Sequence, residues 1–194
     1  MSLRLALIRP GATSYDEQNR VQGILDVPLS PRGREECSRL AADLADIDFD
    51  ALYCGVGTSV EETAEILGRA LALRPRKLEE LHNLDQGLWQ GLQYEEIRKR
   101  NLRLFRQWLE DPRTICPPQG ETVEQAHQRI RDALRPLLRR HRNQTIALVI
   151  PEPLAQIAAA LLRGSAELRL DDQPRTACVE WFDDPHPPGW NGKS

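Results

Sequence analysis

The first residues that could do chemistry stand at the end of an apolar run, where Leu5-Ala6-Leu7-Ile8 is followed by Arg9-Pro10-Gly11-Ala12-Thr13. The guanidinium of Arg9 is always charged and can bind phosphate or carboxylate oxygens in pairs. Pro10 cannot act as a nucleophile, because its ring nitrogen is part of an amide bond. Arg9 is therefore a candidate either for anion binding or for a buried ion pair with a carboxylate.

A second candidate segment, Gly55-Val56-Gly57-Thr58-Ser59, combines glycines with hydroxyl groups. It lacks the lysine and the glycine spacing of a Walker phosphate loop, and Glu61 and Glu62 would repel an anion there. Ser59 and Glu62 have the spacing of the capping box Ser-x-x-Glu. We therefore expect Ser59 to cap the N-terminus of a helix rather than to act as a nucleophile.

Histidines and cysteines show no spacing typical of a metal site, so we predict no metal and no cofactor. Among the histidines, His82 is the candidate for a functional role, because it lies beside Asn83 and close to Asp85. The cysteines never form a Cys-x-x-Cys pair, and we expect them to be reduced and structural. They are Cys37, Cys54, Cys116 and Cys178.

Composition excludes several classes of protein. The chain has 194 residues, of which 40% are hydrophobic and 28% charged, with a formal net charge of −3. This length and composition predict a single globular domain over residues 1–194. The charge gives no general attraction for nucleic acid, and no apolar run approaches the length of a membrane span. Since no secretory signal is visible at the N-terminus, we expect a cytoplasmic protein.

Short apolar runs alternate with longer amphipathic patterns along the chain. This alternation predicts an α/β fold, a three-layer α/β/α sandwich in which helices cover both faces of a mostly parallel central sheet. We expect Ser30 to cap a helix that has Pro31 at its first position, and an irregular C-terminal tail from about Asp183. The expected strands are 3–8, 51–54, 145–150 and 177–182; the expected helices are 31–45, 59–72, one or two within 92–110, 121–141 and 154–162.

The order and spacing of several short motifs resemble the histidine phosphatase superfamily, which includes the phosphoglycerate mutases. The resemblance covers nearly the whole chain and implies the fold of that superfamily, although each motif alone would be weak. The motifs are Arg9-x-Gly11-x-Thr13, Gln22-Gly23, Asp26-Val27-Pro28-Leu29-Ser30, Arg32-Gly33, Glu62-Thr63-Ala64, Gly87-x-Trp89-Gln90-Gly91, Gly120-Glu121-Thr122 and Ala147-Leu148-Val149-Ile150.

The same resemblance assigns chemical roles to particular positions, and most of them hold unsuitable residues. Pro10 stands where the family has its phosphorylated histidine, and Pro151 stands at the place of the second histidine. Ser59 occupies the position of a second phosphate-binding arginine, and Asn83 that of the proton-donating acid. Arg9 matches the family, and Asp85, two residues after Asn83, could have taken over the proton transfer.

Glu152 follows Pro151 at the start of an expected helix. Pro151 and Pro153 fit the first turn of such a helix but remove two backbone N–H donors that would favour an anion there. Glu152 adds a carboxylate where the helix dipole favours negative charge. We hypothesise that Glu152 stands in for the phosphate and pairs with Arg9.

Two functional interpretations remain open. One is a pseudoenzyme that binds an unknown protein or small molecule and could form a homodimer. The other is a phosphatase or mutase that acts on phosphate monoesters through Arg9, His82, Asp85 or Glu152. The sequence favours the pseudoenzyme, because the unsuitable residues gather around one pocket while the scaffold motifs are intact. The segment from Leu92 to Glu110 is a candidate binding surface, or else a lid or a packing helix pair.

Overall fold

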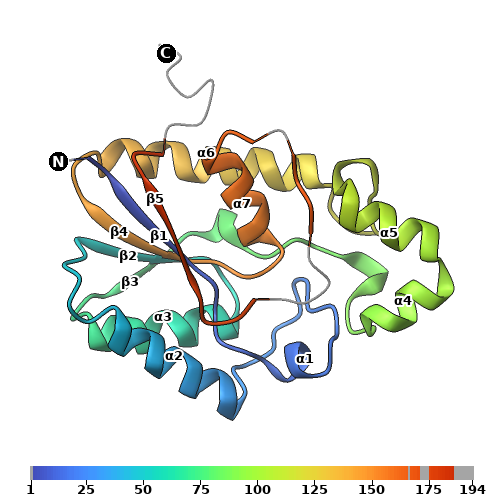
Figure 1. Cartoon of the computed structure of the whole chain (residues 1–194), viewed down its shortest axis with the longest axis horizontal. Helices are drawn as coiled ribbons and strands as arrows, with labels where there is room; N and C mark the ends of the chain where they lie inside the picture. The colour runs from blue at the N-terminus through green and yellow to red at the C-terminus, as the bar shows by residue number, and fades with distance from the viewer. Residues whose placement is uncertain (1, 166, 171–174, 186–194) are drawn as a thin grey trace.

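The computed structural model describes residues 2–165, 167–170 and 175–185. In this part of the chain a five-stranded sheet runs through the middle of the molecule, in the order β3-β2-β4-β1-β5 (Figure 1). Strands β1 to β4 are parallel to their neighbours, whereas β5 pairs with β1 in the antiparallel direction. The strands are β1 (Arg4–Ile8), β2 (Ala51–Cys54), β3 (Pro75–Lys77), β4 (Thr145–Val149) and β5 (Val179–Asp183).

Helices cover both faces of this sheet, which confirms the predicted three-layer α/β/α arrangement. In Figure 1, α2 (Pro31–Asp43) and α3 (Thr58–Ala70) lie on one side, and α6 (Val123–Arg140) and α7 (Leu154–Leu162) lie on the other. Beyond one end of the sheet lie α1 (Ser14–Glu17), α4 (Tyr94–Arg100) and α5 (Leu102–Glu110). Single 3₁₀ turns are formed by Glu79–Leu81, Gly87–Trp89 and Pro112–Thr114.

The two faces of the sheet contribute side chains to two separate hydrophobic cores. Successive side chains of a strand point to opposite faces, so Leu5 and Leu7 pack with α6 and α7, while Ala6 and Ile8 pack with α2 and α3. Strand β4 divides in the same way, with Leu148 on the first side and Val149 on the second. Since both faces of the sheet are buried, the sequences of the strands are nearly continuous apolar runs.

Most element boundaries agree with the sequence-based predictions. Strand 51–54 and helix 154–162 have the predicted bounds, and Ser30 caps α2 by accepting a hydrogen bond from the backbone N–H of Gly33 at 3.0 Å. The short elements α1 and β3 and the three 3₁₀ turns were not predicted. The segment 92–110 forms two helices, and Phe105 and Trp108 are buried in the core. These two aromatic side chains therefore serve packing, not an external surface.

The carboxyl ends of β1 and β4 meet at the same edge of the sheet. Ile8 lies beside Val149, so the residues after these two strands leave the sheet next to each other. Because β5 is antiparallel, it begins at this edge, with Val179 opposite Ile8. In parallel α/β sheets this edge is where ligands bind. It is also where the candidate residues from both strands must gather.

The C-terminal region differs slightly from expectation. Strand β5 continues to Asp183, one residue beyond its predicted end. Residues 186–194 of the expected irregular tail lie outside the described residues. Among the described helices, none has the length and apolar character needed to cross a bilayer.

Gly33 allows the start of α2 to pack against the turn that follows Arg9. A Cβ atom at Gly33 would lie 2.0 Å from the carbonyl oxygen of Ala12. We therefore expect Gly33→Ala to lower the free energy of unfolding by about 1–3 kcal/mol, because the helix must shift to relieve the clash. Urea denaturation measures this effect, with Arg39→Ala on the exposed face of α2 as the control. Equal midpoints for the two variants would contradict the close approach.

Candidate functional site

Arg9 lies at the carboxyl end of β1 and is buried between two carboxylates. Its side chain is only 3% exposed; Nε donates to Oε1 of Glu152 at 2.9 Å, and Nη1 donates to Oε2 of Glu180 at 3.0 Å. The predicted ion pair between Arg9 and Glu152 is therefore confirmed. Glu180 was not predicted, and it reaches Arg9 because β5 starts at this edge of the sheet. It also pairs with Arg163 near the surface.

The charge of Arg9 is balanced within the protein. Burial alone would lower the pKa of the Arg9 guanidinium, but the charges and hydrogen bonds of Glu152 and then Glu180 outweigh burial, and the pKa is raised. A buried charge is tolerated when it is paired and hydrogen-bonded in this way. Arg9 is therefore a permanent cation whose charge is already neutralised.

Glu152 is held by the helix that follows it. Its Oε2 accepts a hydrogen bond from the backbone N–H of Gln156, in the first turn of α7, at 3.3 Å. The expectation that Pro151 and Pro153 occupy this first turn was wrong, because Pro153 is the N-cap and Pro151 precedes it. One carboxylate thus binds both Arg9 and the start of α7.

Pro10, Ser59 and Pro151 meet around a small cavity of about 30 Å³. Glu152 forms part of its wall, whereas Arg9 does not line it. Further residues also line it, of which Gln22 had appeared as part of a motif: Asp16, Arg20, Gln22, Gln86, Tyr94, Gln156, Arg175 and Thr176. Most of them come from loops and short elements, so no periodic pattern pointed to them.

The charged members of this wall offset each other. Burial raises the pKa of Asp16, although the hydrogen bonds that it accepts from Thr13 act in the opposite direction. Arg20 donates through Nη1 to the carbonyl of Gly91 at 2.7 Å. Two carboxyl groups, Asp16 and Glu152, and two guanidinium groups, Arg20 and Arg175, line the cavity. The formal charges of these four lining side chains sum to zero.

The prediction that Ser59 caps a helix was wrong. Helix α3 begins one residue earlier, at Thr58, and its N-cap residue, Gly57, has no side chain to cap it. The cap comes from Asp26, whose Oδ1 accepts from the backbone N–H of Thr58 at 2.8 Å. Ser59 therefore sits inside the first turn, 2% exposed, beside the cavity. A cap supplied from 32 residues away leaves no local signal in the sequence.

Asn83 joins three segments around the cavity. Its Nδ2 donates both to the carbonyl oxygen of Gly23 at 2.9 Å and to that of Glu152 at 2.8 Å, and its Oδ1 accepts from the backbone N–H of Leu84 at 2.9 Å. The residue is only 5% exposed. An ionised carboxylate at this position has no N–H to donate. Asn83 therefore acts as a structural cross-link.

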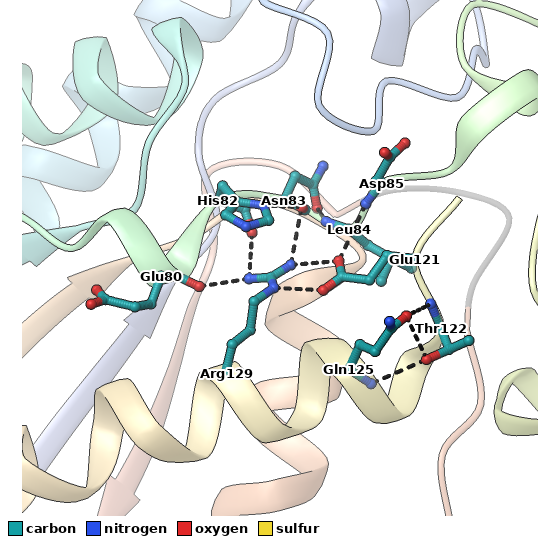
Figure 2. Close-up of polar contacts among 9 residues, drawn as sticks. All are labelled: Glu80, His82, Asn83, Leu84, Asp85, Glu121, Thr122, Gln125 and Arg129. Atoms are coloured by element: carbon teal, nitrogen blue, oxygen red, sulfur yellow. Dashed lines mark hydrogen bonds and ion pairs between the residues drawn. The ribbon is translucent and has the colours of Figure 1, made fainter. Parts of the chain in front are cut away.

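Arg129 of α6 fixes the backbone of the same segment, as Figure 2 shows. Its Nη1 donates to the carbonyl oxygens of Glu80 at 2.6 Å and His82 at 2.8 Å, and its Nη2 donates to that of Asn83 at 3.1 Å. Glu121 holds the guanidinium through both of its oxygens, at 2.7 and 2.8 Å. Glu121 had appeared only as part of a motif, and Arg129 was missed.

His82 and Asp85 lie away from the small cavity, and neither lines it. His82 Nδ1 faces the carbonyl oxygen of Asn83 at 2.9 Å. Oδ1 of Asp85 accepts from the backbone N–H of Gly87 at 2.8 Å. Of the four candidates Arg9, His82, Asp85 and Glu152, the structure therefore brings together only Arg9 and Glu152. Within the described part of the chain, no cluster of three or more His, Cys, Asp or Glu residues is suited to hold a metal ion.

Comparison with known proteins gives this arrangement a context. The family model described as histidine phosphatase superfamily (branch 1) matches residues 5–183. The chain belongs to the histidine phosphatase superfamily. Phosphoserine phosphatase 1 of Hydrogenobacter thermophilus is 29% identical over 161 residues, which are 82% of this chain and 76% of that protein.

Solved structures of the histidine phosphatase superfamily share the fold. Bacillus stearothermophilus YhfR gives a TM-score of 0.80 at 26% identity, covering 93% of this chain and 90% of that one. A mycobacterial glucosyl-3-phosphoglycerate phosphatase, solved as a complex with VO3, gives a TM-score of 0.79 at 25% identity and covers 93% and 96% of the two chains. The sheet and its helical layers are thus those of this superfamily.

The buried ion pair of Arg9 leads to a first prediction about this histidine phosphatase fold. Glu152→Gln removes the negative charge but keeps the shape and one oxygen acceptor. We expect the free energy of unfolding to fall by about 1–3 kcal/mol, because Arg9 is left with a weaker partner in a buried place. Chemical denaturation measures the loss.

The matched control is Glu35→Gln, which breaks an ion pair with Arg39 in which both side chains are 72% exposed. It should change stability by less than about 1 kcal/mol. Equal losses of stability in the two variants would show that the buried pair of Arg9 and Glu152 contributes no more than the exposed pair of Glu35 and Arg39.

The two hydrogen bonds donated by Asn83 generate a second prediction. Asn83→Asp should lower the free energy of unfolding by at least about 2 kcal/mol at neutral pH, since both carbonyl oxygens lose their donor. At about pH 4 the penalty should shrink, because a protonated aspartic acid regains one O–H donor. The exposed Asn19→Asp serves as the control. A penalty that grows as the pH falls would contradict this assignment.

Proposed function

We propose that this chain is a catalytically inactive member of the histidine phosphatase superfamily that acts as a binding or regulatory protein. The observation that carries the proposal is the burial of Arg9 between Glu152 and Glu180, at 2.9 and 3.0 Å. An arginine that binds a phosphoryl group must offer it free N–H donors and uncompensated charge. Arg9 has no uncompensated charge, because Glu152 and Glu180 bind its Nε and Nη1, and it does not line the cavity.

The residue types at the aligned positions support the same conclusion. Neither Pro10 nor Pro151 has a nitrogen that can attack phosphorus or transfer a proton. Asn83 carries no acidic proton, and Ser59 supplies no positive charge. General acid catalysis contributes about 10²–10⁴-fold, and an arginine on the transferred phosphoryl group about 10³-fold or more. Hydrolysis of a phosphate monoester requires acceleration of up to about 10²¹-fold.

The size of the cavity also favours inactivity. The cavity between Pro10 and Pro151 has a volume of about 30 Å³, whereas pockets that hold small molecules measure about 300–1,000 Å³. A phosphate monoester would have to displace side chains of the wall, and Glu152 is one of them. Displacement would leave both Arg9 and Glu152 to find new partners, at a cost typical of breaking a buried ion pair.

The alternative, a phosphatase or mutase with a new set of residues, has no comparable support. It requires some of the residues Arg9, His82, Asp85 and Glu152 to act together on one reacting phosphorus atom. His82 and Asp85 lie outside the wall of the cavity. The carboxylate of Asp85 is engaged with the backbone of Gly87. Of these four residues only Glu152 lies beside Arg9, and its carboxylate is engaged in the ion pair with Arg9.

A hydrolysis assay tests the proposal. The purified protein is incubated with p-nitrophenyl phosphate, phosphoserine, 3-phosphoglycerate and a set of sugar phosphates, and phosphate release is measured. We expect no turnover above that of Arg9→Ala purified in parallel, because Arg9 is not available to a substrate. Turnover by the unaltered protein that disappears in Arg9→Ala would overturn the proposal. Circular dichroism of the variant shows whether it is folded.

A further inference from the structure

A second, larger hollow adjoins the small cavity. It is a groove of about 370 Å³, and it shares Gln22, Ser59 and Pro151 with the small cavity. The groove is formed by residues 22–26, by residues 56–61 at the start of α3, and by His82 and Asn83. Arg9 does not line it. Its volume lies within the range of pockets that bind small molecules.

One part of the groove is apolar and open to solvent. Ile24 is 50% exposed and Leu25 is 37% exposed. They are two of the four large hydrophobic side chains that are exposed in the described part of the chain. Val56 and Val60 add to the same wall. Apolar side chains that gather at a concave site favour a ligand with an apolar portion.

The inner part of the groove presents a buried hydroxyl group. Ser59 is 2% exposed, and its Oγ makes no hydrogen bond to the described residues, whereas its backbone carbonyl accepts from Thr63. This Oγ is not one of the fully enclosed polar atoms that lack a partner, so it is accessible from the hollows that Ser59 lines. Ser59 lines the groove, so a polar group of a ligand can satisfy it there.

The remaining polar groups of the wall are mainly acceptors. Nδ1 of His82 faces the carbonyl oxygen of Asn83, so in the neutral imidazole this nitrogen carries the proton and Nε2 is left as an acceptor. Asp26 and Glu61 are the carboxylate side chains in the wall, and it contains no lysine or arginine among the described residues. The groove therefore suits a ligand that donates hydrogen bonds and carries positive charge.

The carboxylate of Asp26 also excludes an anion from the start of α3. A helix N-terminus ordinarily attracts anions, but here Oδ1 of Asp26 accepts from both the backbone N–H and the hydroxyl of Thr58. These hydrogen bonds lower the pKa of Asp26, which stays ionised. On the other side, Glu61 already binds one ammonium group, Nζ of Lys77, at 2.6 Å. Asp26 Oδ2 and Glu61 Oε1 make no hydrogen bond within the described chain.

We propose that this groove binds a primary ammonium group carried on an apolar chain. The ammonium lies against Asp26 and Glu61, with Ser59 as a further acceptor, and the apolar chain covers Ile24 and Leu25. This assignment rests on the proposed function, in which the neighbouring anion pocket is closed and binding replaces catalysis. The ligand would have the opposite charge to a phosphate monoester. Such a group is found on free alkylamines and on the lysine side chains of proteins.

The experiment uses three probes of equal chain length: hexylammonium, hexanol and hexanoate. Each is titrated into the ¹⁵N-labelled protein, and the backbone amide resonances of Gly23, Ile24 and Gly57 are followed by NMR. We expect hexylammonium to shift these resonances with saturation, hexanol to bind at least about fivefold more weakly, and hexanoate to bind least. Equal binding of hexanol and hexylammonium, or no saturable shift with hexylammonium, would overturn the proposal.

Substitutions test which carboxylates and which apolar side chain contribute to binding. Asp26→Asn keeps an oxygen that can cap α3, so it removes charge while preserving the fold. It should weaken hexylammonium binding about twofold to fivefold, as should Glu61→Gln. Ile24→Ser should weaken hexylammonium and hexanol alike. Glu35→Gln, on the exposed face of α2, is the charge control and should bind normally. Binding that is unaffected by both groove carboxylate variants would contradict the assignment.

A peptide with one lysine between leucines distinguishes the two sources of ammonium. If the peptide binds more tightly than hexylammonium, and Asp26→Asn abolishes that binding, the partner is a protein. If the peptide binds equally or more weakly, the ligand is a small amine. Both results support the ammonium site. The hydrolysis assay is independent of these titrations. A protein that hydrolyses phosphate esters yet binds hexylammonium would overturn only the proposed function, and an inactive protein that does not bind it would overturn only the groove.

Discussion

The site depends on the need to neutralise one buried guanidinium. Arg9 follows directly on β1, so its backbone is fixed by the sheet and its side chain is enclosed. A charge in such a place requires partners of opposite sign within hydrogen-bonding distance. Glu152 comes from the loop after β4 and Glu180 from the start of β5. The two strands that flank β1 therefore each bring one carboxylate to the same cation.

Around this ion pair, hydrogen bonds to the backbone hold the loops of the sheet edge together. Asn83 ties its own segment to the chain at Gly23 and at Glu152. Arg129 ties the same segment to α6 on the far side. The wall shared by the small cavity and the groove is consequently supported from two directions. Such support is typical of a preformed site rather than of one that forms around its ligand.

Local patterns in the sequence predicted local structure well. The strand at 51–54 and the helix at 154–162 were recognisable because each is a continuous apolar run with clear boundaries. Ser30 was recognisable as a cap because its partner, Gly33, lies three residues away. The alternation of apolar runs and amphipathic patterns predicted the three-layer arrangement, and the order of the family motifs implied the same fold.

Contacts between distant segments could not be predicted from the sequence. Asp26 takes over the capping of α3 from outside the helix, which made the local Ser59–Glu62 pattern misleading. Glu180 was missed because its position depends on the antiparallel register of β5 against β1. The pairing of Arg9 with Glu152 was predictable only because the family motifs placed both residues at the same edge of the sheet. The groove is formed by three segments that are distant in the sequence, and no single segment contains a pattern that predicts it.

The double pairing of Arg9 also limits how this protein can change during evolution. Placing histidines at positions 10 and 151 would restore two imidazole rings, yet Arg9 would still be bound by Glu152 and Glu180. Removing either carboxylate first would destabilise the fold before any activity could compensate. Under the proposed function, the gain of phosphatase chemistry would therefore require substitutions at several positions, and the loss of either carboxylate would lower stability on the way. The double pairing of Arg9 is then a stability constraint that opposes the gain of catalysis through single substitutions.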